Sequence, residues 1–127
     1  MKAYHLSFDV INVKDNFDDN YEEAKRFIVC VLAQTDPISI VKYTASTFII
    51  SYIDDGNTKF SSKLFKYLKT ELSKYFHYTI SKISVFTDKS LALDFKSNKN
   101  LEKDFNSYFN SDISCDFKGK SIGEFKL

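Results

Sequence analysis

The chain has 127 residues, of which 43% are hydrophobic and 28% are charged, and its formal net charge is +1. This length suits one domain with a single core, the composition excludes wholesale disorder, and the small net charge excludes a generally basic nucleic-acid-binding protein. Aromatic residues are frequent, with eight Tyr and thirteen Phe, and they favour β-strands and an aromatic core.

The first predicted element is a half-buried strand over residues 3–11, because apolar and polar side chains alternate there. Its apolar side carries Tyr4, Leu6, Phe8 and Val10. Its polar side carries His5, Ser7 and Asp9. A cluster of Asp and Asn residues follows, which is typical of a turn and a helix start, and apolar residues at spacings of three and four then predict a helix over 19–34.

Two β-branched and aromatic runs, 38–43 and 46–53, are separated by Thr44 and Ala45 and predict a hairpin. Asp54-Asp55-Gly56-Asn57 is typical of a turn, and Asn57 or Thr58 can cap a second helix over 58–76. Residues 78–86 alternate again and predict a fourth strand.

The predicted order is therefore strand, helix, strand, strand, helix, strand. The compact solution for this order is an α+β, ferredoxin-like βαββαβ sandwich, with two helices on one face of an antiparallel sheet. Six apolar side chains are expected between the layers: Leu6, Phe8, Phe27, Val31, Leu64 and Leu68.

Residues 1–87 form this predicted core, and residues 88–127 are an extension expected to pack on the core or on a partner subunit. Within the extension we expect a short strand over 91–95, a short helix over 101–109 and a further strand over 114–117. An open sheet face and an open sheet edge are usually covered, which favours a symmetric homodimer.

The two cysteines, Cys30 and Cys115, do not suggest a disulfide framework. Cys30 falls within the apolar pattern of the first helix, where an unpaired cysteine behaves as a small buried hydrophobe. No apolar run approaches the ~18 residues of a membrane span, and the amino terminus lacks the pattern of a targeting signal. We therefore expect a cytoplasmic protein without a membrane partner.

Two short motifs resemble a known family. The first strand ends in Phe8-Asp9-Val10, and the hairpin carries the run Tyr43-Thr44-Ala45-Ser46-Thr47-Phe48-Ile49-Ile50. Together with the element order over residues 3–86, they resemble the family of the second CRISPR-associated protein. The likeness is closest to its SinR-like branch, and virulence-associated protein D is a cousin. The resemblance implies a ferredoxin-like homodimer with Asp9 as a metal ligand at the dimer interface, and with Ser46, Thr47 and Phe48 beside it.

Asp9 has two interpretations from the residues alone: a cap for the following turn, or a ligand of Mg²⁺ or Mn²⁺. A catalytic triad of His5, Ser7 and Asp9 is excluded, because neighbours on one strand face are ~6.6 Å apart. His5 could still lie near the same metal. The acidic residues between 15 and 23 lack the spacing and central Gly of a calcium loop and suit the first turn of a helix.

Positive charge is concentrated in one element, because residues 59–77 have a net charge of +4 while residues 1–58 have a net charge of −4. Lys59, Lys63 and Lys66 are spaced to share one face of the second helix. They form either a solvated helix face or a strip that contacts a phosphate backbone without reading sequence.

Two functions follow as hypotheses. The first is a metal-dependent endonuclease acting on RNA or DNA, in which Asp9 holds Mg²⁺ or Mn²⁺, Ser46 and Thr47 supply hydroxyls, and Lys59, Lys63 and Lys66 bind nucleic acid. The second is a non-catalytic dimeric module that binds nucleic acid or protein through a degenerate site.

Overall fold

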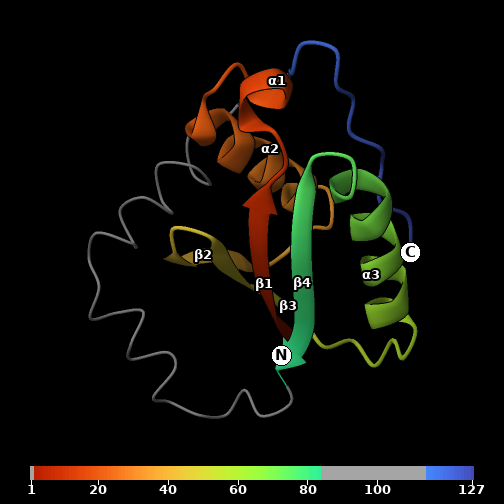
Figure 1. Ribbon diagram of the computed structural model, residues 1–127. Coiled ribbons are helices and arrows are strands. Elements are labelled where there is room, and N and C mark those ends of the chain that lie inside the picture. Colours follow the sequence, from red (N-terminus) through yellow and green to blue (C-terminus); the bar gives the residue numbers. More distant parts are fainter. Residues whose placement is uncertain (1, 84–113) are drawn as a thin grey trace.

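A computed structural model describes residues 2–83 and 114–127 of the chain (Figure 1). Within the first range the elements are β1 (Lys2–Val10), α1 (Val13–Phe17), α2 (Tyr21–Ala33), β2 (Ser39–Thr44), β3 (Thr47–Tyr52), α3 (Phe60–Leu72) and β4 (Phe76–Ile83). The strands form one antiparallel sheet in the order β2-β3-β1-β4. The predicted α+β class with a four-stranded antiparallel sheet is confirmed.

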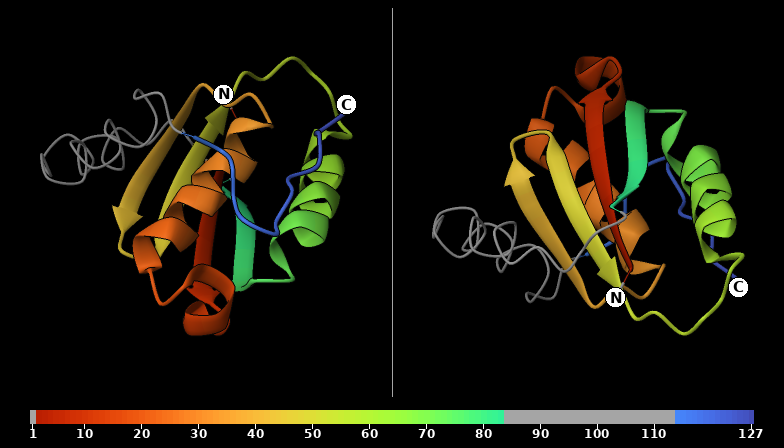
Figure 2. Two further views of the ribbon diagram at one scale, coloured as in Figure 1. Left: turned by 90° about the horizontal axis from the view of Figure 1, so that it is seen from above. Right: turned by 90° about the horizontal axis from the view of Figure 1, so that it is seen from below.

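Both long helices, α2 and α3, cover the same face of the sheet, as predicted (Figure 2). All six side chains expected between the layers are buried, and none is more than 3% exposed: Leu6, Phe8, Phe27, Val31, Leu64 and Leu68. The apolar side of β1 faces the helices, because Tyr4, Leu6 and Phe8 are buried in the core and Val10 packs against it. The polar side of β1 therefore faces the helix-free side of the sheet.

Phe27 of α2 lies at the centre of an aromatic cluster. Its ring centroid is 5.4 Å from that of Tyr75, 6.0 Å from that of Phe76 and 5.9 Å from that of Phe17. Edge-to-face and stacked ring pairs at this spacing add to the free energy gained by burial. The frequent Phe and Tyr residues of the sequence are thus used largely to join the two layers.

The helix-free face of the sheet has two parts. Along β3 and the start of β1 its side chains are buried: Ala3, Thr47, Ile49 and Ser51. Along β4 they are exposed at alternate positions: His77, Thr79 and Ser81. The polar side chains that solvent can reach on this face therefore lie beside β4, an edge strand in the part of the chain that the structure describes.

The short helix α1 is a finding that the sequence pattern did not predict. Asn12 caps it by accepting a hydrogen bond from the Asp15 backbone and donating one to the Asp15 carboxylate. Asp18 and Asp19 then adopt left-handed backbone conformations, which stop the helix. The Asn20 side chain accepts from the backbone N–H groups of the first turn of α2 and starts that helix. The Asp and Asn residues that follow the first strand thus form the short helix α1 as well as the start of α2.

Further predictions about element boundaries, helix caps and the extension need correction or fall outside the described residues. Helix α3 ends at Leu72, and β4 begins at Phe76, two residues before the predicted strand. Neither predicted cap is the cap of α3, since Lys59 takes that position and Asn57 instead accepts from the Lys59 backbone N–H. The predicted strand over 114–117 is wrong, because Phe117 forms only an isolated bridge with Lys120. The elements expected over 91–95 and 101–109 lie outside the described residues.

The expectation that Cys30 is unpaired is also wrong, because Cys30 and Cys115 form a disulfide with a Cα–Cα distance of 5.8 Å. The predicted burial of Cys30 is confirmed. The two cysteines are 85 positions apart, and the sequence pattern contains no signal that brings residue 115 to the surface of α2. Among the described residues, no helix is long and apolar enough to cross a bilayer.

The aromatic cluster predicts a large difference between two truncations. Phe27→Ala removes a fully buried ring and should lower the free energy of unfolding by about 3–5 kcal/mol. Ile53→Ala removes a side chain that is 72% exposed and should change it by less than about 0.5 kcal/mol. Urea denaturation of both variants measures the two values, and similar losses would contradict the packing described here.

Candidate functional site

The site is built by the pairing of β1 with β4. Asp9 lies directly opposite His77, and Ser7 lies opposite Thr79. Residues in register on neighbouring antiparallel strands present their side chains on the same face. The sheet therefore brings a carboxylate, an imidazole and two hydroxyl groups together on its helix-free face.

These side chains line a pocket of about 290 Å³, together with Ser46 from the turn between β2 and β3. The backbone holds this turn against β1, because the Phe8 N–H donates to the Ser46 carbonyl at 3.0 Å. Asp9 and His77 are exposed, whereas Ser7 and Ser46 are half-buried. The pocket thus has an ionisable pair that solvent reaches and a hydroxyl-lined wall.

Thr47 lies behind the pocket rather than in its wall. It is opposite Ser7 on β3 and is almost completely buried. The two hydroxyl oxygens are 3.2 Å apart and share a hydrogen bond. Thr47 therefore positions the Ser7 hydroxyl, and Ser7 is the group that a ligand can reach.

The negative charge of Asp9 acts on Tyr21, which lies at the edge of the helix layer. Burial is the main reason why the pKa of Tyr21 is raised, the positive charge of Lys25 lowers it, and the negative charges of Asp9 and Glu22 raise it further. The Tyr21 ring stacks on Phe8 at a centroid distance of 6.3 Å, and its hydroxyl donates to the Ala45 carbonyl. Tyr21 thus links α2 to the turn that carries Ser46.

A single chain offers two strong candidate metal ligands at the pocket, the Asp9 carboxylate and the His77 imidazole. Mg²⁺ commonly binds through one or two carboxylates and keeps several waters, and imidazole also suits Mn²⁺. Among residues 2–83 and 114–127, no group of three or more His, Cys, Asp and Glu side chains converges on one point. The donor set of one chain therefore fits a hydrated cation but does not enclose one.

The structure brings some of the predicted site residues together and separates others. Asp9 and Ser46 line the same pocket, with Thr47 behind it. Lys63 and Lys66 are exposed on α3, and Lys59 is exposed at its N-cap. This helix covers the opposite face of the sheet (Figure 2). Lys63 and Lys66 border a different hollow, beside Lys126. The lysines and the Asp9 pocket are thus on different sides of one chain.

Sequence reasoning missed His77. The strand was predicted to begin at residue 78, so His77 was treated as part of the connection, whereas β4 begins at Phe76. The signal that was missed is the alternation of apolar and polar residues, which begins one residue pair earlier than predicted. Phe76, Tyr78 and Ile80 alternate with polar residues, and His77 is the first of these polar residues. His5, considered earlier as a neighbour of a metal, is four positions from Asp9 along β1, or ~13 Å at the usual rise of a strand.

No protein-family model matches the sequence, no curated protein matches it, and no solved structure matches it. The resemblance to the family of the second CRISPR-associated protein therefore stays a prediction. The candidate site is supported by the geometry of the pocket alone.

The electrostatic contact between Asp9 and Tyr21 can be measured. Asp9→Asn removes a negative charge that raises the pKa of Tyr21, so this pKa should fall. Asp36→Asn is the matched control, because Asp36 is exposed before β2, and asparagine tolerates its left-handed backbone at φ 57°. NMR titration of the Tyr21 ring at alkaline pH measures the change. An equal change in the pKa of Tyr21 in both variants, or no change in either, would show that Asp9 does not act on Tyr21.

Proposed function

We propose that the chain is a metal-dependent endonuclease that cleaves RNA or DNA at the pocket on the helix-free face of the sheet. The observation that carries the proposal is the register of β1 and β4, which puts Asp9 opposite His77 beside the hydroxyl of Ser7. A carboxylate, an imidazole and hydroxyl donors are the groups that phosphodiester hydrolysis needs for cation binding, proton transfer and phosphate positioning.

Each group has a proposed role. Asp9 would hold Mg²⁺ or Mn²⁺, and a cation bound there would supply Lewis acidity toward a water molecule and the phosphate. His77 would accept the proton of the attacking water, because its imidazole is exposed to solvent and lies directly opposite Asp9. The hydroxyls of Ser7 and Ser46 donate to phosphate oxygens, with Thr47 fixing Ser7.

We also infer that the fold is ferredoxin-like and that the active form is a homodimer. The strand order β2-β3-β1-β4, and the sequence of two strand–helix–strand units, support the fold. The exposed half of the helix-free face supports a second copy docking there, and so does the outer edge of β4, which pairs with no strand among the described residues. Two copies would supply two Asp9 carboxylates, which would share a cation that one chain cannot enclose, and each His77 would stay free to act as the base.

The lysines receive a separate role in this proposal. Lys59, Lys63 and Lys66 are exposed along α3 and its N-cap and lie away from the pocket, so they would bind phosphates at a distance from the cleaved bond. Such contacts do not read sequence and weaken as salt concentration rises. The lysines would therefore affect substrate affinity more than the chemical step.

A second candidate is a non-catalytic dimeric module that binds nucleic acid or a protein. The observation that favours it is the absence, among the described residues, of three or more converging metal-ligating side chains. The same lysine face would then be the main binding surface. The expected cytoplasmic location also stays a proposal, and such a compartment would favour reduction of the Cys30–Cys115 disulfide.

The decisive experiment measures cleavage of single-stranded and duplex RNA and DNA with Mg²⁺ and with Mn²⁺. Asp9→Asn should abolish cleavage, because it removes the charge that holds the cation and keeps the shape of the side chain. His77→Gln should lower the rate by roughly 10²–10⁴-fold, the usual contribution of a general base. Asp36→Asn is the control of equal charge change and should be fully active.

Light scattering of the same samples should report a dimer for the wild type and for each variant. A wild type that cleaves none of the substrates with either cation would reject the nuclease and leave the binding module. An active Asp9→Asn variant would reject this pocket as the site.

A further inference from the structure

Residues 114–127, the C-terminal strap, lie across the outer side of the helix layer and run from α2 to α3 (Figure 2). At α2 the ring of Phe117 contacts Phe27, with centroids 5.0 Å apart. At α3 the ring of Phe125 lies 5.2 Å from that of Tyr67, whose hydroxyl donates to the Gly123 carbonyl at 2.5 Å. The strap contains almost no regular secondary structure, so side-chain contacts hold it in place.

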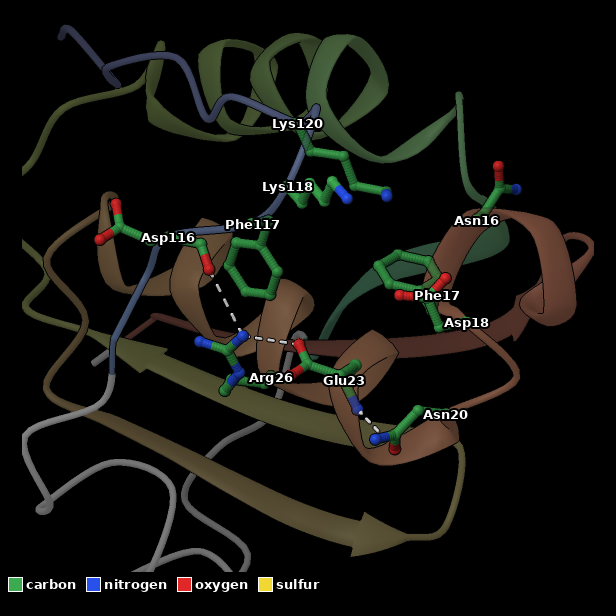
Figure 3. A pocket seen from close by; sticks show the side chains of 10 residues that line it. All are labelled: Asn16, Phe17, Asp18, Asn20, Glu23, Arg26, Asp116, Phe117, Lys118 and Lys120. Atoms are coloured by element: carbon green, nitrogen blue, oxygen red, sulfur yellow. Dashed lines mark hydrogen bonds and ion pairs between the residues drawn. The ribbon is translucent and has the colours of Figure 1, made fainter.

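The start of the strap is fixed to α2 by one covalent bond and one arginine. The disulfide joins Cys115 to Cys30. Arg26, one turn earlier on α2, donates to the carbonyls of Ser114 and Asp116 and lies over the Phe117 ring at 4.2 Å (Figure 3). The same arginine pairs with Glu23 on its own helix. The disulfide and the contacts of Arg26 all hold the first four residues of the strap against α2.

The two sulfur atoms differ in their surroundings. Cys30 is 1% exposed and belongs to the buried side of α2. Cys115 lies in an exposed stretch of the strap. A thiolate from solvent can therefore approach the disulfide from the side of Cys115, while the helix layer protects Cys30.

We propose that the Cys30–Cys115 disulfide is a thiol-exchange site, attacked at Cys115 by a small thiol or dithiol reductant, and that its reduction releases the C-terminal strap from α2. The proposal is independent of the nuclease pocket, which lies on the other face of the sheet. It assigns a chemical modification to a pair of residues that the proposed function does not use.

The thiol–disulfide exchange proceeds in two steps. A reductant thiolate attacks the Cys115 sulfur, a bond forms between those two sulfurs, the Cys30–Cys115 bond breaks, and Cys30 leaves as a thiolate that takes up a proton. A second thiol, from the same dithiol or from another monothiol molecule, then attacks the reductant sulfur of the mixed disulfide, releases Cys115 as a thiol and leaves the reductant as a disulfide. The protein gains two electrons and two protons, and the reductant loses them.

With the strap in place, a hollow of about 310 Å³ lies between it and the α1–α2 connection (Figure 3). Release of the strap would remove one wall of this hollow. The strap supplies one wall of it through Asp116, Phe117, Lys118 and Lys120. Lys120 reaches across and lies 4.9 Å from the centre of the Phe17 ring. The redox state of one disulfide would thus change both the cover of the helix layer and the shape of this hollow.

The test compares strap mobility in the oxidised and reduced full-length protein. Trypsin cleavage after Lys118 and Lys120, followed by mass spectrometry, should become at least about tenfold faster after treatment with dithiothreitol, because the crosslink no longer returns the strap to α2 after a local opening. Cys115→Ser should be cleaved at the fast rate without reductant and should not respond to it. Ser121→Ala alters another exposed strap residue, keeps both cysteines and should behave as the wild type.

Maleimide labelling of the folded protein gives a second readout. The oxidised wild type should take up no label, and after reduction Cys115 should react well before Cys30, because only Cys115 is exposed. Two reactive thiols in protein purified under air and treated with oxidised glutathione would show that the bond does not form. Equal trypsin rates for oxidised and reduced wild type would show that the bond does not control the strap. Either result overturns the proposal.

Discussion

The alternation of side chains along β1 is the constraint on which the rest of the structure depends. Tyr4, Leu6 and Phe8 are buried against the two helices. Because side chains alternate along a strand, the residues between them point to the helix-free face. A shift of one residue in register would exchange these sets and bury Asp9 in an aromatic core, at a cost that the fold could not offset. The position of the candidate site is thus a consequence of the same apolar packing that stabilises the domain.

Most of the fold could be predicted from the sequence because its signals are local. The helix over 19–34 and the hairpin between residues 38 and 53 follow from periodicity, and the structure has their boundaries within one or two residues. The C-terminal end of α3 was predicted less well, because Tyr75 continues the apolar pattern after the helix has stopped at Leu72. An apolar residue in a turn can pack on the core at the same sequence spacing as an apolar residue in a helix. The spacing alone therefore does not show where the helix ends.

Part of the site could be predicted as well, since Asp9 and Ser46 line the same pocket. The parts that could not be predicted depend on contacts between distant residues. His77 joins Asp9 only through the register of β1 and β4, and Cys115 meets Cys30 only because the strap returns across α2. Lysines on α3 share a face of their helix, as their spacing indicates, but spacing cannot say on which side of the sheet that helix lies.

The central claim is that the pocket beside β1 and β4 binds a divalent cation, and paramagnetic broadening of NMR signals by Mn²⁺ tests it most directly. Broadening decreases steeply with distance from the ion, so it locates the site without any assumption about catalysis. The account predicts that substoichiometric Mn²⁺ broadens the backbone amides of Ser7, Asp9, Ser46 and His77 first. Initial broadening at the acidic residues between 15 and 23, or no selective broadening at all, would contradict it.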